Sequence, residues 1–246
     1  MRWGRSAAVR YDTSIRERLR QLLLLATLLC QVGLLTAYAA SGDVLVARFG
    51  AGDLSGWESR SFAGETVYRP REGGLCAESR ASASGLFRQI RIDLQQTPIL
   101  HWSWKVDRGL PPADERSKAG DDYAARIYVV FSGGVLFWRT RAINYVWSAA
   151  EYPGATWPNA FTASAQMMAV QGAQAQVGVW RHESRDVRAD FIRLFGVDIR
   201  YADAVAIMSD TDNGGGRTAA CYGDIWFQAA PREGPREGGT AKPAPG

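Results

Sequence analysis

Acidic and amide side chains gather near the C-terminus in the stretch SDTDNGGGRTAACYGDIWF, residues 209–227. Asp210, Asp212 and Asn213 carry the hard oxygen ligands that calcium prefers, and a run of glycines follows them. An EF-hand is excluded, because its twelfth position requires Glu and here holds Cys221. The favoured interpretation is a turn between two strands, in which Asp and Asn side chains accept backbone N–H bonds and glycines permit positive φ.

A looser calcium site remains an alternative for the same stretch. Its ligands are Asp210, Asp212 and the more distant Asp224, which lies in the closing strand just beyond the loop. Structural calcium is the one cofactor that the sequence indicates, and the sequence alone does not decide between the metal site and the turn.

A second acidic pair, Asp121 and Asp122, stands before a predicted strand that carries Arg126. Glycosidases use two carboxylates at a set separation. Adjacent residues at the start of a regular strand point to opposite sides of the sheet, so these two aspartates do not serve one site. A structural Asp–Arg pair or a turn cap is the better interpretation. The chain also lacks the G-x-S-x-G, H-E-x-x-H and P-loop patterns, so the sequence favours binding over catalysis.

The predicted ligand face is formed by polar side chains that alternate with apolar ones on three strands. Its members are Lys105, Arg126, Tyr128 and Asn144, with Trp104 or Trp147 as a stacking surface. Sugar hydroxyls accept hydrogen bonds from Arg and Asn, and sugar C–H faces stack on aromatic rings. The alternative is an ordinary solvated face of a β-sandwich.

Short runs with period-two alternation recur between turn signals and must position these side chains. The expected strands include 44–49, 100–106, 123–131, 142–147, 166–171, 175–183, 204–209 and 221–227. One segment has helical spacing instead, with Ser184 or Asp186 as N-cap, Val187, Phe191, Leu194 and Phe195 on one face, and Gly196 as its end. The sequence therefore predicts an all-β, antiparallel jelly-roll-type sandwich with one short helix over residues 43–229.

The N-terminal 40 residues are typical of an export signal. A basic leader precedes the apolar run Leu22–Leu35, and Ala37-Tyr38-Ala39 supplies a cleavage pattern. We expect cleavage near Ala39 or Ala40. The alternative is an uncleaved N-terminal anchor, and without it the chain has no stable membrane span. Both interpretations place the domain outside the cytoplasm, in the periplasm or secreted.

The cysteine content fits this destination. Cys30 lies within the apolar run, so cleavage leaves Cys76 and Cys221. An exported domain with two cysteines suggests one disulfide, and two separate buried thiols are the alternative.

The net charge of +4 does not indicate a nucleic-acid partner. Six of the 29 basic and two of the 25 acidic residues lie in residues 1–40, so the remaining chain carries 23 of each. A nucleic-acid-binding protein needs a net basic face.

At the C-terminal end, residues 230–246 repeat PREG, lack large apolar side chains and are predicted to be disordered.

Four strings occur together in the chain: KAGDDYAARIYVVF, AINYVW, ESRDVRADFIRLFG, and AIMSDTDN with CYGDIWF. In combination they resemble the bacterial domain-of-unknown-function family 3047. The resemblance covers roughly residues 44–228 and implies an exported protein. The opening Phe49, Gly56 and Trp57 and the closing GDIWF are also similar to jelly-roll carbohydrate-binding modules. In those modules an aspartate of the last strand helps to hold calcium. The likeness therefore implies the same role for Asp224 in this chain.

These observations together predict an exported, non-catalytic binding domain for a glycan or a cell-envelope ligand. A glycosidase-like enzyme on the same scaffold is the first alternative, and a structural envelope protein is the second. A convergent pair of carboxylates in a cleft would favour the enzyme.

Overall fold

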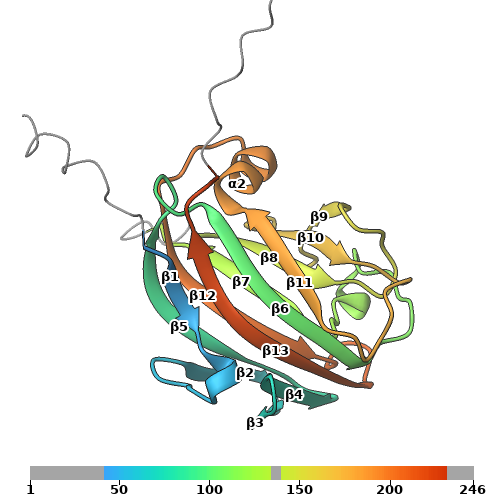
Figure 1. Cartoon of the computed structure of the whole chain (residues 1–246). Coiled ribbons are helices and arrows are strands. Elements are labelled where there is room, and N and C mark those ends of the chain that lie inside the picture. Colours follow the sequence, from blue (N-terminus) through green and yellow to red (C-terminus); the bar gives the residue numbers. More distant parts are fainter. Residues whose placement is uncertain (1–41, 134–139, 232–246) are drawn as a thin grey trace, which may run out of the picture. The chain divides into compact units, whose positions relative to one another are not determined.

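The computed structural model of the chain describes residues 42–133 and 140–231, which form a β-sandwich of two sheets (Figure 1). The predicted leader with Cys30 and most of the predicted disordered tail lie outside these residues. No helix in the described ranges is both long enough and apolar enough to cross a membrane.

The first sheet has six strands. Its order is β11 (Arg181–Asp186), β6 (Ile99–Arg108), β13 (Arg217–Gln228), β4 (Gly74–Arg80) and β3 (Val67–Arg71), and β1 (Val44–Ala47) pairs with the last part of β13. Figure 1 shows β6 and β13 side by side along the middle of this sheet.

The second sheet has seven strands. Its order is β2 (Glu58–Ala63), β5 (Ala83–Asp93), β12 (Tyr201–Asp210), β7 (Arg126–Phe131), β8 (Arg141–Trp147), β10 (Ala165–Gln171) and β9 (Thr156–Pro158). All its pairs are antiparallel except β8 with β10. The chain between those two strands is long enough to return to the same end of the sheet, as a parallel pair requires.

Period-two alternation builds the core between the sheets. On β6, Trp102, Trp104 and Val106 are fully buried, while the intervening side chains face outward and are partly exposed. The indole of Trp102 meets the ring of Tyr145 from β8 at 5.4 Å between centroids, so the two inner faces interdigitate. The predicted jelly-roll-type β-sandwich is therefore confirmed.

The single α-helix of the described ranges is α2 (Val187–Phe195), and its prediction is also confirmed. The Asp186 side chain accepts the N–H of Ala189, and Gly196 ends the helix with φ 68°. Phe191 packs on Phe131 of β7 at 4.1 Å between ring centroids, which fastens the helix to the core.

Two further short helical turns, η1 (Phe49–Ala51) and η2 (Lys118–Gly120), lie in loops. Two predicted strands begin later than expected, since the strand predicted at 123–131 starts only at Arg126 and the one predicted at 175–183 starts only at Arg181. Residues 175–180 form a turn and irregular backbone, and β11 starts only at Arg181. Gly178 takes a positive φ of 76°, which an extended strand does not allow.

Candidate functional site

The predicted ligand residues do not share one face. Arg126, Tyr128 and Asn144 lie on the outer face of the seven-stranded sheet, where Tyr128 is the direct cross-strand partner of Asn144. Lys105 lies on β6 in the other sheet, so its assignment to the same face is wrong. Alternation within a strand says which side chains share a face, but it does not say which strands are neighbours.

The predicted stacking surface is also wrong. Trp104 is fully buried and Trp147 is 5% exposed, and their rings meet in the core at 5.8 Å between centroids. Arg126 and Asn144 are buried as well, at 4% and 1% exposed. Both side chains are therefore covered by neighbouring residues, and Tyr128 is the predicted residue on this sheet that remains partly exposed.

Arg126 is the centre of a buried polar cluster. Its Nε donates to Asp210 Oδ1 at 2.9 Å and its Nη2 binds Asp210 Oδ2, which makes the pair bidentate. The rings of Tyr123 and Tyr128 lie 4.7 and 5.6 Å from the guanidinium carbon. Burial alone would lower the pKa of Arg126, but Tyr128, Asp121 and Tyr123 raise it, so the side chain remains charged.

Asp121 joins this cluster from the loop before β7. Its carboxylate lies 3.8 Å from Nη1 of Arg126 and accepts hydrogen bonds from Asn159 Nδ2 on both oxygens, at 3.0 and 3.1 Å. Burial raises the pKa of Asp121, and the Arg126 charge and the Asn159 amide partly oppose that rise. The interpretation of Asp121 and Arg126 as a structural pair agrees with this geometry.

The loop after β12 is a turn, but another residue caps it. The two carboxylate oxygens of Asp122 accept the backbone N–H groups of Asn213 and Gly214 at 3.0 and 2.7 Å. Gly215 supplies the positive φ of 71° that the turn requires. Asp210 does not cap the turn, because its oxygens face Arg126.

The acidic groups meet in a different combination from the predicted metal set. Carboxylate oxygens of Asp122, Asp210 and Asp212 lie within 4.8 Å of one another. Asp224 is not part of this group, because it lies farther along β13 and accepts the N–H of Gly50 at 2.8 Å. Its assignment as the third ligand is wrong. A guanidinium beside Asp210 and two N–H groups on Asp122 occupy the oxygens that a cation would need.

An aromatic row adjoins the buried cluster on the same face. The ring centroids of Phe62 and Phe87 are 6.3 Å apart, and those of Phe87 and Tyr128 are 6.4 Å apart. Arg60 places its guanidinium 5.0 Å from the Phe87 ring, and Phe62 is 66% exposed. The sequence did not point to Phe62 and Phe87, because the row exists only through the pairing of β2, β5, β12 and β7.

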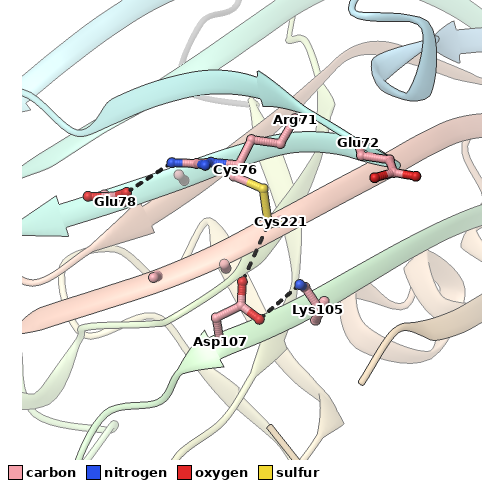
Figure 2. A pocket seen from close by; sticks show the side chains of 10 residues that line it. Arg71, Glu72, Cys76, Glu78, Lys105, Asp107 and Cys221 are labelled. Atoms are coloured by element: carbon pink, nitrogen blue, oxygen red, sulfur yellow. Dashed lines mark hydrogen bonds and ion pairs between the residues drawn. A yellow bond between two sulfur atoms is a disulfide. The ribbon is translucent and has the colours of Figure 1, made fainter. Parts of the chain in front are cut away.

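On the six-stranded sheet, Cys76 and Cys221 form a disulfide across β4 and β13. It lies in an open groove of about 610 Å³ that Lys105 also lines. Figure 2 shows Lys105 and Asp107 extending from β6 toward Cys221. The structure thus contains the disulfide, which the sequence analysis had given as one alternative beside two separate buried thiols.

Removal of the Asp210 carboxylate should strongly destabilise the domain. In Asp210→Ala the buried guanidinium of Arg126 loses its bidentate partner, and we expect the free energy of unfolding to fall by about 3–5 kcal/mol. Urea unfolding followed by tryptophan fluorescence measures this loss. Asp212→Ala is the control and should change stability by about 0.5 kcal/mol or less. The pair Arg126→Met with Asp210→Leu should recover most of the loss, and an equal cost for Asp210→Ala and Asp212→Ala would contradict the assigned role.

Chelation should leave the melting temperature unchanged. An ion that binds only the folded state stabilises it by mass action, and here protein donors already engage Asp122 and Asp210. Differential scanning fluorimetry with EDTA, and then with excess calcium, checks this expectation. A drop with EDTA that calcium restores and that Asp212→Ala abolishes would establish a metal site instead.

Comparison with solved structures finds jelly-roll carbohydrate-binding modules at low similarity. A family 11 module from Clostridium thermocellum, in complex with a β-1,3-1,4-mixed-linked tetrasaccharide, is 12% identical with a TM-score of 0.36, covering 78% of this chain and 98% of that chain. A family 28 module specific for non-crystalline cellulose is 13% identical with a TM-score of 0.39, at the same coverage. The adhesin domain of Lys-gingipain from Porphyromonas gingivalis is 13% identical with a TM-score of 0.35, covering 77% of this chain and 99% of that one.

No curated protein matches the chain. A protein-family model does match it, over residues 55–226, and that span holds both the Arg126 cluster and most of the two sheets. Two strings that carry the sequence resemblance, at 118–131 and 206–213, meet in this cluster through Arg126 and Asp210. The chain belongs to the family described as "Protein of unknown function (DUF3047)".

Proposed function

We propose that this protein is an exported, non-catalytic domain that binds a glycan or another polymer of the cell envelope on the outer face of its seven-stranded sheet. The observation that carries the proposal is the row of Phe62, Phe87 and Tyr128 with Arg60 beside it. Aromatic faces stack on the C–H faces of sugars, and a guanidinium donates to their hydroxyls.

The row suits an extended ligand better than a small one. Its three rings come from β2, β5 and β7, so contacts are spread across the strands rather than enclosed in a cavity. The buried Arg126–Asp210 pair under one end keeps Tyr128 in place, with the ring 5.6 Å from the guanidinium carbon. A ligand that lies across several strands, such as a linear polysaccharide, gains binding free energy from its contact with each ring.

A glycosidase on the same face receives less support. Asp122 and Asp210 do approach each other, as a catalytic pair would. However, Asp210 is fully buried, and its carboxylate is held by Arg126. Asp122 holds the turn through two backbone N–H bonds, so neither group is free to act on a substrate. A structural envelope protein without a soluble ligand is the remaining alternative.

Export is part of the proposal and rests on the N-terminal sequence. The basic leader, apolar run and Ala37-Tyr38-Ala39 pattern occur together. The Cys76–Cys221 disulfide supports the same destination, because disulfides persist in oxidising compartments outside the cytoplasm.

Binding should be lost when the aromatic row is removed. The full chain is screened against a glycan array and against insoluble envelope polysaccharides in pull-down assays. For any glycan bound, Phe87→Ala with Tyr128→Ala should weaken binding by about tenfold or more, since each stacked ring contributes about 0.5–1.5 kcal/mol. Tyr152→Ala, which removes a 72% exposed ring elsewhere, is the matched control and should bind normally.

Circular dichroism must show that the double variant is folded. Wild-type affinity in a folded double variant would remove this face as the site, and release of reducing sugar would favour the enzyme. Absence of binding to every glycan tested would favour the structural alternative.

Fractionation of cells that express the full chain tests export. We expect the protein in the periplasm or medium, shortened near Ala39 or Ala40, because the leader is removed on translocation. Leu25→Arg, which puts a charge into the apolar run, should keep it in the cytoplasm at full length. Full-length protein in the membrane fraction would indicate the uncleaved anchor, and wild-type protein in the cytoplasm would contradict export.

A further inference from the structure

The groove on the six-stranded sheet is a direct result of short side chains on its central strand. On the outer face of β13, Ala219 and Cys221 form a low floor. Longer side chains rise on both sides, Arg71 and Glu78 from the β3–β4 hairpin and Lys105 and Asp107 from β6. The disulfide therefore lies on the floor of an open, charged groove rather than in the core (Figure 2).

The two sulfur-bearing residues differ in access. Cys76 is partly exposed, whereas Cys221 is 4% exposed. A thiolate that enters the groove therefore reaches Cys76 more easily than Cys221. Attack on Cys76 makes Cys221 the leaving group.

Each cysteine has a basic residue as its cross-strand neighbour. Arg69 on β3 is the cross-strand partner of Cys76, and Lys105 on β6 is the cross-strand partner of Cys221. Such cations stabilise a thiolate. Negative charge opposes them, because Asp107 lies 3.7 Å from Cys221 Sγ and is itself paired with Lys105 at 3.0 Å, and Glu72 and Glu78 also line the groove.

The fold around the disulfide does not depend on the bond to hold its strands together. β4 and β13 are paired from Arg217–Arg80 to Tyr222–Leu75. Leu75 and Tyr222 also point inward and are at most 1% exposed, so the core anchors both strands. Cleavage of the bond should leave the sheet intact.

We propose that this groove is a thiol–disulfide exchange site, at which a dithiol reduces the Cys76–Cys221 bond in the folded domain. A thiolate of the dithiol attacks Cys76 Sγ, a mixed disulfide forms, and the bonding electron pair leaves with Cys221 Sγ, which then takes a proton from solvent. The second thiol of the dithiol loses its proton and attacks its partner sulfur in the mixed disulfide. Cys76 is released as a thiol, so two electrons pass to the domain and the dithiol becomes a disulfide.

Lys105 and Asp107 set the rate of this exchange in opposite directions. Negative charge develops on Cys221 Sγ as the bond breaks, and Asp107 repels it while Lys105 attracts it. Both residues belong to one ion pair, so removal of either one breaks the same contact. A mere loosening of the groove would therefore change the rate in the same direction in both variants, whereas electrostatic control changes it in opposite directions.

The test is the rate of reduction of the full chain by dithiothreitol, followed by quenching and thiol counting. Asp107→Asn should raise the second-order rate constant by about fivefold, as expected for one charge at about 4 Å in water, and Lys105→Gln should lower it. The double variant should return close to the wild-type rate, and added salt should reduce all the differences. Tryptophan fluorescence should stay native after reduction.

Two results would overturn the proposal. The first is a rate that stops rising with dithiothreitol concentration at the rate of global unfolding, since the bond would then open only in the unfolded chain. The second is the same direction of change in Asp107→Asn and Lys105→Gln. Neither result bears on glycan binding, which uses the other sheet.

Discussion

A buried ion pair between the first residue of β7 and the last residue of β12 organises the polar cluster on the seven-stranded sheet of this domain. Arg126 and Asp210 have side chains at most 5% exposed, and their bond is bidentate. Removing two charges from water costs about as much as their attraction returns, so the pair adds little net stability. The effect of the pair on strand register matters more than its effect on stability. Met208 of β12 is the cross-strand partner of Arg126, and Asp210 lies two residues beyond it, so a register shift would separate the two charges and leave each one buried alone.

The rest of the polar cluster follows from that pair. Asp121 closes the third side of the guanidinium, and Asn159 holds Asp121 from the β9–β10 region. The neighbouring Asp122 fastens the turn after β12 by two N–H bonds. A loop before β7 and a turn after β12 are thus fixed to each other, and the acidic residues act as structural acceptors. This explains why a stretch with the composition of a metal loop is held by protein donors.

The two sheets present different chemistry to solvent because different side chains occupy the outward positions of their central strands. On the seven-stranded sheet, small Ala206 on β12 stands between Phe87 and Tyr128 in the cross-strand row, so both rings remain accessible. On the six-stranded sheet, the short residues of β13 leave a groove with Cys76–Cys221 at its floor. One outer face therefore presents a row of aromatic rings, and the other presents a charged groove with a disulfide at its floor.

The sequence by itself determined the elements. Period-two runs predicted the sandwich, and Ser184 or Asp186 with Gly196 predicted the ends of α2, because both signals depend on residues close in the chain. Only the tertiary structure decided which strands are neighbours. Lys105 and Arg126 lie on different sheets, and Trp104 and Trp147 lie in the core. Asp122, rather than Asp224, joins Asp210 and Asp212 in the group of neighbouring carboxylates. The tertiary structure also joined two cysteines that are 145 residues apart. Alternation is a local property, whereas strand pairing depends on contacts between distant segments, and these decide which polar side chains meet.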